Sequence, residues 1–278
     1  MQHGVPSRTA QRVALRRAAH QVLDHPKIFD DPLAIPILGP KAAAAVHDPT
    51  GMFDRRLRAF MAARSRYAED QLACSIDQGV RQYVVLGAGL DTYAYRSHPH
   101  IRVFEVDHPA TQEWKRWRLD QAGIAIPEAM RFVPVDFERH SLDQELARAG
   151  FDLNQPAFFS WLGVIMYLTL DAATATLRFI ASLHPGSGVV FDYALSASAL
   201  SPITRLARNA LARRVARAGE PFRLYFDPSD LARLLLELGF GELEELSVKK
   251  IDEKYFSNRG DGLKIGNGAA HLICARVI

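Results

Sequence analysis

The feature that most constrains the fold is a regular alternation, in the middle of the chain, of short apolar runs with segments of helical periodicity. The apolar runs are rich in β-branched and aromatic residues and span residues 83–86, 103–106, 132–135, 158–162 and 189–193. Helical segments near 110–122, 142–149 and 171–183 lie between them. This alternation is typical of a parallel sheet with crossover helices, and continuously apolar strands indicate burial on both faces. The sequence therefore predicts a doubly wound α/β domain.

The flanking regions add helices and two further strands. Helical spacing of apolar residues over 9–23 and 54–75 predicts an N-terminal helical cap, with a short helical stretch from residue 29 that ends at Gly39. Near the C-terminus, Asp227 and Pro228 begin an amphipathic helix that ends at Gly239. Residues 243–248 and 271–277 are predicted strands. We expect one compact unit without a linker.

Composition argues against several classes of protein. The 278 residues are 48 % hydrophobic and 23 % charged, as in a globular chain with a proper core. No apolar stretch approaches the ~20 residues of a membrane span, and residues 1–10 lack a signal-peptide core, so we expect a cytoplasmic protein without stable membrane insertion. A net charge of +3 with interleaved signs does not predict nucleic-acid binding. Cys74 and Cys274 are expected to be buried thiols, and without zinc spacing we expect no metal site.

The strongest local motif is the glycine turn in VVLGAGLDT, residues 84–92. A buried strand runs into Gly87, Ala88 and Gly89, where the missing side chains let the backbone approach a ligand, and we expect a helix to follow. The third glycine of the dinucleotide fingerprint is replaced by Thr92. Asp91 would repel a pyrophosphate but suits the α-ammonium group of a methionine moiety. The turn therefore favours a methyl donor over a dinucleotide, with a purely structural turn as the alternative.

Acidic residues also follow the next two predicted strands. The second strand ends with Glu105, Val106 and Asp107, where a carboxylate can accept hydrogen bonds from both hydroxyls of an adenosine ribose. After the third strand, Asp136 can accept from an adenine amino group while Phe137 flanks the ring. An ordinary helix N-cap explains Asp136 equally well.

Together these motifs resemble the leucine carboxyl methyltransferase family. The matching segments are GAGLDTYAYR at 87–96, FEVDHP at 104–109, VDF at 135–137 and GVIMYLT at 163–169. The resemblance is closest to the bacterial branch of S-adenosylmethionine-dependent methyltransferases, which includes polyketide O-methyltransferases. SRTA at 7–10, FDDPL at 29–33, RSRY at 64–67 and YFDP at 225–228 also match that branch in the expected order.

The resemblance implies a class I methyltransferase fold, a Rossmann-like sheet of seven strands with an antiparallel last strand. It implies a helical cap over residues 1–78 that contributes to the cofactor site, and an α/β domain over 79–278 with a helical insertion near 195–220. The implied cofactor is S-adenosyl-L-methionine, with S-adenosyl-L-homocysteine as product. Arg64 would then pair with the methionine carboxylate, and Glu105 with the ribose. The other implied site residues are Gly87, Ala88, Gly89 and Asp91 for the amino acid portion, Asp136 and Phe137 for the adenine, and Val106, Asp107 and Ser160 beside them.

The acceptor is less constrained than the cofactor. After the fourth strand the chain has Ser160, Trp161 and Leu162, where eukaryotic members often carry a carboxylate, so a leucine carboxyl substrate does not follow. Trp161 either walls the cavity or belongs to the core. We assign no catalytic residue, because a carboxylate acceptor is already ionised at neutral pH and only a phenol would benefit from a base. Tyr167 is a candidate for orienting the acceptor, with packing as the alternative.

We therefore expect an O-methyltransferase that acts on a carboxylate or hydroxyl of a small metabolite. The alternatives are a non-catalytic S-adenosylmethionine-binding protein, a methyltransferase for protein C-terminal carboxyl groups, and a nicotinamide oxidoreductase. The oligomeric state is not predicted.

An arginine-rich segment over 200–218 combines an apolar stripe with a basic face. Its arginines are Arg205, Arg208, Arg213, Arg214 and Arg217, and residues 204–218 contain no acid. Three interpretations are open: a solvated helix, a mobile lid that recognises an acidic acceptor, and a helix that lies on a membrane surface.

Overall fold

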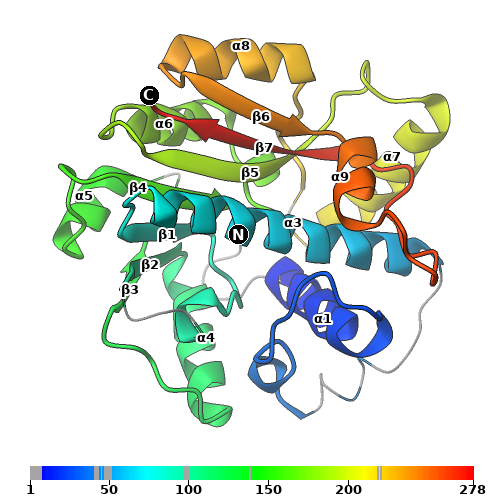
Figure 1. The fold of residues 1–278 in the computed structure, drawn as a ribbon, viewed down its shortest axis with the longest axis horizontal. Coiled ribbons are helices and arrows are strands. Elements are labelled where there is room, and N and C mark those ends of the chain that lie inside the picture. Colours follow the sequence, from blue (N-terminus) through cyan, green and yellow to red (C-terminus); the bar gives the residue numbers. More distant parts are fainter. Residues whose placement is uncertain are drawn as a thin grey trace.

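Seven strands form one sheet in the order β3-β2-β1-β4-β5-β7-β6 (Figure 1). The structure is a computed structural model that describes residues 8–40, 44, 46, 52–96, 100–137, 139–217, 219 and 221–278; Ser7 of the predicted 7–10 motif lies outside these ranges. Strands β1 to β5 pair in parallel, and β7 is antiparallel to both β5 and β6. This confirms the predicted class I methyltransferase sheet. The strands are β1 (Gln82–Leu86), β2 (Arg102–Asp107), β3 (Met130–Pro134), β4 (Ala157–Trp161), β5 (Gly188–Ala194), β6 (Glu242–Leu246) and β7 (Ala270–Arg276).

The helices lie close to the predicted ones. The α-helices are α1 (Arg8–Leu23), α3 (Met52–Asp77), α4 (Pro109–Gln121), α5 (Leu142–Arg148), α6 (Leu170–Ala181), α7 (Pro202–Ala216), α8 (Pro228–Leu238) and α9 (Val248–Tyr255). Short 3₁₀ helices are η1 (Pro36–Leu38), η3 (Tyr93–Tyr95) and η4 (Ile165–Tyr167). Helix α8 begins and ends as its sequence predicts, because the Asp227 side chain accepts from the Ser229 N–H and Gly239 closes the helix at φ 106°.

Two local predictions are wrong. No α-helix follows the glycine turn; the chain makes only η3, and α1 occupies the adjacent space, with Arg17 donating to the Leu90 carbonyl at 2.9 Å. The predicted strand over 243–248 is too long at its end, because the Ser247 hydroxyl accepts from the Lys250 N–H and caps α9, a helix that the sequence reading missed.

Helices cover both faces of the sheet (Figure 1). On one face α3 packs Ala63, Tyr67 and Leu72 into the same core as Val85 of β1 and Val190 of β5. On the other face the core contains residues of α5, α6 and α8 with the opposite side of the strands. A third cluster joins α1, η1 and α4. Because α3 shares its core with the sheet, the predicted boundary at residue 78 does not divide two hydrophobic cores.

Helix α1 is tied to α3 by a buried ion pair. Arg58 donates to both carboxylate oxygens of Asp24, at 2.8 and 2.9 Å. The His20 Nδ1 lies 2.9 Å from Asp24, and its Nε2 accepts from the backbone N–H groups of Ile28 and Phe29. His20 is therefore a neutral donor to Asp24, and this network fixes the N-terminal helix on the rest of the fold.

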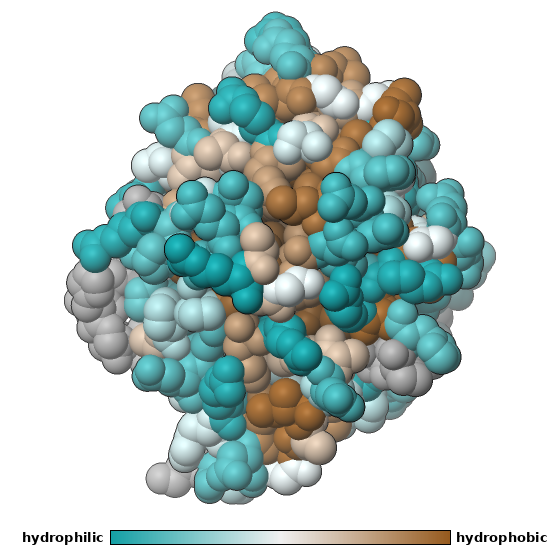
Figure 2. Space-filling model, turned by 90° about the vertical axis from the view of Figure 1, so that its left-hand side faces the viewer, coloured by the Kyte–Doolittle hydropathy of each residue, from teal (hydrophilic) through white to brown (hydrophobic). Residues whose placement is uncertain are grey.

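The parallel strands point away from the face seen in Figure 2. Strand β7 runs toward the left of Figure 1, and the parallel strands run the opposite way. Figure 2 shows that left-hand face, where hydrophobic residues form a band between hydrophilic ones. The C-terminal Ile278 is 80 % exposed.

Within the described ranges, no helix is both long enough and apolar enough to span a bilayer.

Candidate functional site

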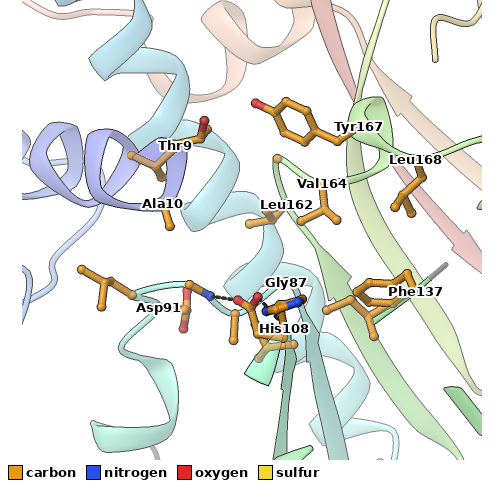
Figure 3. Close-up of a pocket in the computed structure, with 18 of the residues that line it drawn as sticks. Thr9, Ala10, Gly87, Asp91, His108, Phe137, Leu162, Val164, Tyr167 and Leu168 are labelled. Atoms are coloured by element: carbon orange, nitrogen blue, oxygen red, sulfur yellow. Dashed lines mark hydrogen bonds between the residues drawn. The ribbon is translucent and has the colours of Figure 1, made fainter. Parts of the chain in front are cut away.

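A cavity of about 320 Å³ lies at the carboxyl ends of the parallel strands, where open α/β sheets bind ligands. Its floor is the glycine turn with the ends of β2, β3 and β4, and α1 forms a side wall. Figure 3 shows Asp91 and Phe137 at opposite ends of this floor, with Gly87 and His108 between them. All the predicted site residues except Glu105 and Val106 line the cavity.

The glycine turn is held in place by β2. The N–H groups of Gly87 and Ala88 donate to the Val106 carbonyl at 2.8 and 3.0 Å. Val106 therefore supports the turn through its backbone. Gly87 has φ 67°, and a Cβ there would lie 2.3 Å from Cγ2 of Val164. Gly89 has φ 48°, and a Cβ there would lie 3.1 Å from Cβ of Ala10. Both conformation and space therefore require glycine at Gly87.

Asp107 is the carboxylate that β2 presents to the cavity. Its Oδ2 accepts from the Gly89 N–H at 2.6 Å, and its Oδ1 accepts from the His108 N–H at 2.7 Å. Burial raises the pKa of Asp107, although these two hydrogen bonds favour the ionised form. The carboxylate is thus both part of the turn and part of the cavity wall.

Glu105, which the sequence predicts to contact a ribose, is not among the residues that line the cavity. It is fully buried, with Oε2 2.6 Å from Nζ of Lys115 and accepting from the Tyr95 hydroxyl at 3.0 Å. Burial raises the pKa of Glu105 to about 7, against the opposing effect of Lys115. Two residues correspond to about 6.6 Å along a strand. Glu105 therefore lies deeper below the sheet edge than Asp107, which lines the cavity.

Asp91 faces the cavity as an ionised carboxylate. Its Oδ1 accepts from the Tyr93 N–H at 2.8 Å, and its Oδ2 lies 3.5 Å from Nη1 of Arg17. Burial would raise the pKa of Asp91, but Arg17, Lys115 and Arg96 outweigh it and lower the pKa. The charge is therefore present at neutral pH.

Arg17 is a cavity residue that sequence reasoning missed. It also forms an ion pair with Asp31 at 3.0 Å and is 5 % exposed. Nothing in the helical pattern of α1 distinguishes it from the neighbouring Arg16, since the contacts that bury it come from residues far along the chain.

Arg64 of α3 lines the cavity as predicted. It is held there by Asp192, which was not a predicted site residue. Its Nη1 donates to Oδ2 of Asp192 in β5 at 2.8 Å, and both side chains are almost fully buried. Asp192 also accepts from the Gly163 N–H. The guanidinium lies against Gly163, where a Cβ would be 2.8 Å from Nη1. Arg64 is therefore a rigidly held cation that keeps other N–H groups for a ligand.

The far end of the cavity is formed by Asp136, Phe137 and Ser160. Asp136 does not cap α5, whose N-cap is Ser141, so the N-cap alternative is wrong. The Ser160 Oγ accepts from the Tyr83 hydroxyl at 2.7 Å. Trp161 is fully buried, lines neither this cavity nor the next one, and belongs to the core. Its ring centroid lies 6.4 Å from that of Phe137.

A second cavity of about 290 Å³ adjoins the first. Helices α1, α3 and α7 and the loop before β7 enclose it, and its lining is mostly apolar. The two cavities share a junction, which we define as Thr9, Val13, Arg64, Gly163 and Tyr167. Figure 3 shows Thr9 and Tyr167 on the side of the first cavity away from Gly87. The junction thus links a polar cavity to an apolar one.

The arginine-rich segment forms α7, one wall of the second cavity. Arg208 lines this cavity and donates to the Leu195 carbonyl at 2.9 Å. Ile203 also lines the cavity but is 78 % exposed, and Leu206, which does not line it, is 68 % exposed. The side chain of Arg214 lies outside the described part of the structure. Helix α7 therefore lies beside the second cavity as part of its wall.

The described residues contain no cluster of three histidine, cysteine, aspartate or glutamate side chains able to hold a metal ion. Cys274 is buried as expected, but the same expectation is wrong for Cys74, which is exposed.

Known proteins resemble this chain in both sequence and fold. The family model "Leucine carboxyl methyltransferase" matches residues 10–181. "Putative S-adenosyl-L-methionine-dependent methyltransferase YktD" of Bacillus subtilis is 34 % identical over 292 residues and covers 95 % of each chain. A protein of the same description from Mycobacterium tuberculosis, Rv3787c, is 33 % identical over 201 residues, or 66 % of this chain and 65 % of that protein.

Two solved structures share the fold at low sequence identity. A "putative methyltransferase" from Thermobifida fusca has a TM-score of 0.61 at 18 % identity, covering 99 % of this chain and 96 % of that one. A DUF574 family protein from Streptomyces avermitilis has a TM-score of 0.54 at 18 % identity, covering 95 and 97 %.

Proposed function

This chain belongs to the leucine carboxyl methyltransferase family and is an S-adenosylmethionine-dependent methyltransferase, and we propose that it methylates a carboxylate oxygen of a small acid. One observation carries the choice of a carboxylate. Among its described residues, the junction between the two cavities has no carboxylate or imidazole able to take a proton. Asp192, the acid that lines the second cavity, is engaged by Arg64. An acceptor at the junction must therefore arrive already ionised.

The first cavity fits the cofactor in the order of its charged and polar groups. Asp91 would accept from the α-ammonium group, Asp107 from the ribose hydroxyls, and Phe137 would flank the adenine while Asp136 accepts from its amino group. Asp91 and Phe137 lie at opposite ends of the cavity, and His108, whose N–H binds Asp107, lies between them (Figure 3). This is the order of the corresponding groups along an extended S-adenosylmethionine molecule.

Other residues of the prediction would act through shape and position. The turn at Gly87, Ala88 and Gly89 brings backbone close to the amino acid portion. Arg64, fixed by Asp192, would bind the methionine carboxylate through the N–H groups that Asp192 does not use. Ser160, held by Tyr83, would offer its hydroxyl to the same region.

Bound S-adenosylmethionine supplies a methyl group on a sulfonium, which an oxygen nucleophile accepts by in-line displacement. The protein then has to align the acceptor and exclude water, because a carboxylic acid with a pKa near ~4 is ionised at neutral pH. Thr9 of α1 and Tyr167 of η4 flank the junction and would orient the acceptor oxygen. The α1 wall and the apolar second cavity would keep water out.

A screen for S-adenosylhomocysteine release tests this proposal, with carboxylic acids and phenols of matched size and a peptide ending in leucine. We expect turnover of acids, with a rate that is flat between about pH 6 and 9 because the acceptor stays ionised. Turnover of phenols with a rate that rises with pH would contradict carboxylate specificity. Cofactor binding by calorimetry without any turnover would favour a non-catalytic binding protein.

A further inference from the structure

We propose that the acceptor is an amphipathic acid with two anionic ends: the inner carboxylate receives the methyl group, and the outer anionic group binds arginines at the mouth of the second cavity. This inference rests on the proposed function, because the inner end has to meet the methyl donor at the junction. It adds a recognition site that is remote from the reacting atoms.

The charge of the second cavity is strongly one-sided. Arginines line it from three helices: Arg12 and Arg16 of α1, Arg56 and Arg64 of α3, and Arg208 of α7. Asp192 is the single acid among its described lining residues, and the Arg64 guanidinium and the Gly163 N–H already neutralise it. Apolar walls exclude solvent and concentrate this positive field inside the cavity. The cavity therefore selects for anions.

Two of these arginines have unused donors. Within the described part of the chain, the guanidinium groups of Arg12 and Arg56 donate no hydrogen bond and form no ion pair. Arg208, in contrast, donates to the Leu195 carbonyl and to Asn209, and it lies 4.8 Å from the Tyr225 ring centroid. Arg12 and Arg56 thus have guanidinium groups that are available to a ligand, and a guanidinium can bind a carboxylate through two parallel hydrogen bonds.

The other residues that line the second cavity favour a ligand with an apolar body. Side chains on all sides are hydrophobic: Leu57, Phe60, Met61, Met166, Leu211 and Phe222. A volume of about 290 Å³ suits a small molecule and not a folded protein segment. A small inorganic anion would satisfy the arginines but leave the apolar walls in water. An acid with a hydrocarbon body satisfies both.

The spacing of the arginines sets the separation of the two ends. Arg64 at the junction is buried and Arg56 at the rim is exposed, and both lie on the same face of α3. Two turns of helix separate them, which is about 12 Å at ~1.5 Å per residue. Arg56 lies against the loop before β7, since its guanidinium carbon is 3.6 Å from the position of a Cβ on Gly266. An extended long-chain dicarboxylate spans this distance, whereas a short one does not.

The test compares dodecanedioate with dodecanoate, a monoacid of the same length, by S-adenosylhomocysteine release. We expect kcat/KM at least about tenfold higher for the diacid, since one charge-assisted pair is worth roughly this factor. Arg12→Gln and Arg56→Gln should each lower kcat/KM for the diacid by about fivefold to tenfold and leave the monoacid unchanged. Arg205→Gln, an exposed arginine of α7 that lines neither cavity, is the matched control.

Equal kcat/KM for the two acids in the unmodified protein, or an equal loss for both in the arginine variants, would overturn the proposal. If neither acid is methylated, the recognition site is judged by calorimetry, while the proposed reaction is judged by the wider screen of acids and phenols. Dodecanedioate titrated into the complex with S-adenosylhomocysteine should bind more tightly than dodecanoate and lose that advantage in Arg56→Gln. Binding that ignores this substitution refutes the site independently of the chemistry.

Discussion

The two cavities are built in different ways. The first has a floor made of strand ends, where backbone conformation and buried carboxylates fix each position; the Gly87 turn and Asp107 even share a hydrogen-bond network. The second is enclosed by α1, α3 and α7 and the loop before β7, and its character comes from the arginine and apolar side chains that these elements supply. Single substitutions should therefore reduce ligand binding strongly in the first cavity and only moderately in the second.

The largest effect is expected at the glycine turn. Gly87→Ala places a Cβ 2.3 Å from Val164 and forces alanine into φ 67°. We expect affinity for S-adenosylhomocysteine, measured by calorimetry, to fall by about a thousandfold, because the turn has to move away from Asp107 and β2.

Gly79→Ala is the matched control for this substitution. Gly79 also has a positive φ, of 97°, but a Cβ there meets nothing within 4 Å. It should show the cost of backbone strain alone, about 1 kcal/mol of stability, with unchanged affinity. Equal affinity in Gly87→Ala and the unmodified protein would mean that the cofactor does not bind on this turn.

The next effect tests whether both cavities depend on the attachment of α1, which supplies walls to each. Asp24→Asn leaves the buried Arg58 without its charged partner and should cost about 3 kcal/mol of unfolding free energy. Chemical denaturation measures the change. Arg66→Gln, which breaks an exposed pair with Asp70 on the same helix as Arg58, should cost less than about 1 kcal/mol.

The pH dependence of stability follows from the same pair. Burial raises the pKa of Asp24, but hydrogen bonds from Arg58 and His20 outweigh it and lower the pKa to about 2. The folded state thus binds this proton less readily than the unfolded state. The resulting stabilisation is present above the ordinary carboxyl pKa of 3.8 and is lost as the pH falls toward about 2. Asp24→Asn should remove this part of the acid dependence, and an unchanged acid profile would contradict the assignment.

A smaller effect separates the two acids of β2. Asp107→Asn removes a charge that would accept from the ribose hydroxyls, and should weaken S-adenosylhomocysteine binding by about 2 kcal/mol, or roughly thirtyfold. Glu105→Gln should leave that affinity within about threefold, because Glu105 contacts Lys115 and Tyr95 below the cavity. If Glu105→Gln weakens binding more than Asp107→Asn, the placement of the ribose at Asp107 is wrong.

The contrast between Glu105 and Asp107 also shows what sequence reasoning can reach. The apolar runs located all seven strands, because their pattern is local, and the glycine turn located the floor of the first cavity. The depth of each acid below the sheet edge depends on where β2 ends. The FEVD motif alone therefore leaves both Glu105 and Asp107 as candidates for the ribose contact. The structure adds that Lys115 pairs with Glu105, a contact that the motif does not reveal.

Contacts between residues far apart in the sequence could not be predicted, for a similar reason. Arg64 and Asp192 are separated by 128 positions, and only the packing of α3 across β5 brings them together. The same holds for Arg17, whose contacts lie on the loop after the glycine turn. The expected helix after that turn is replaced in the described residues by η3, and α1 packs beside the turn through the contact of Arg17 with Leu90. The sequence suggested an acceptor-binding role for the segment that forms α7 but did not predict the second cavity, since no motif connects the helices that form its walls.

The smallest expected effect on activity comes from a substitution at the junction, which the two cavities share. Tyr167→Phe keeps the ring contact with Phe222, whose centroid is 5.3 Å away, and removes only the hydroxyl. If that hydroxyl orients the acceptor, kcat should fall by about fivefold, as expected for one hydrogen bond of ~1 kcal/mol, while affinity for S-adenosylhomocysteine stays the same. Phe222→Leu, which changes the packing partner and keeps the hydroxyl, should raise KM for the acceptor more than it lowers kcat. A loss of cofactor affinity in Tyr167→Phe would instead show that the Tyr167 hydroxyl belongs to the cofactor site and not to the acceptor site.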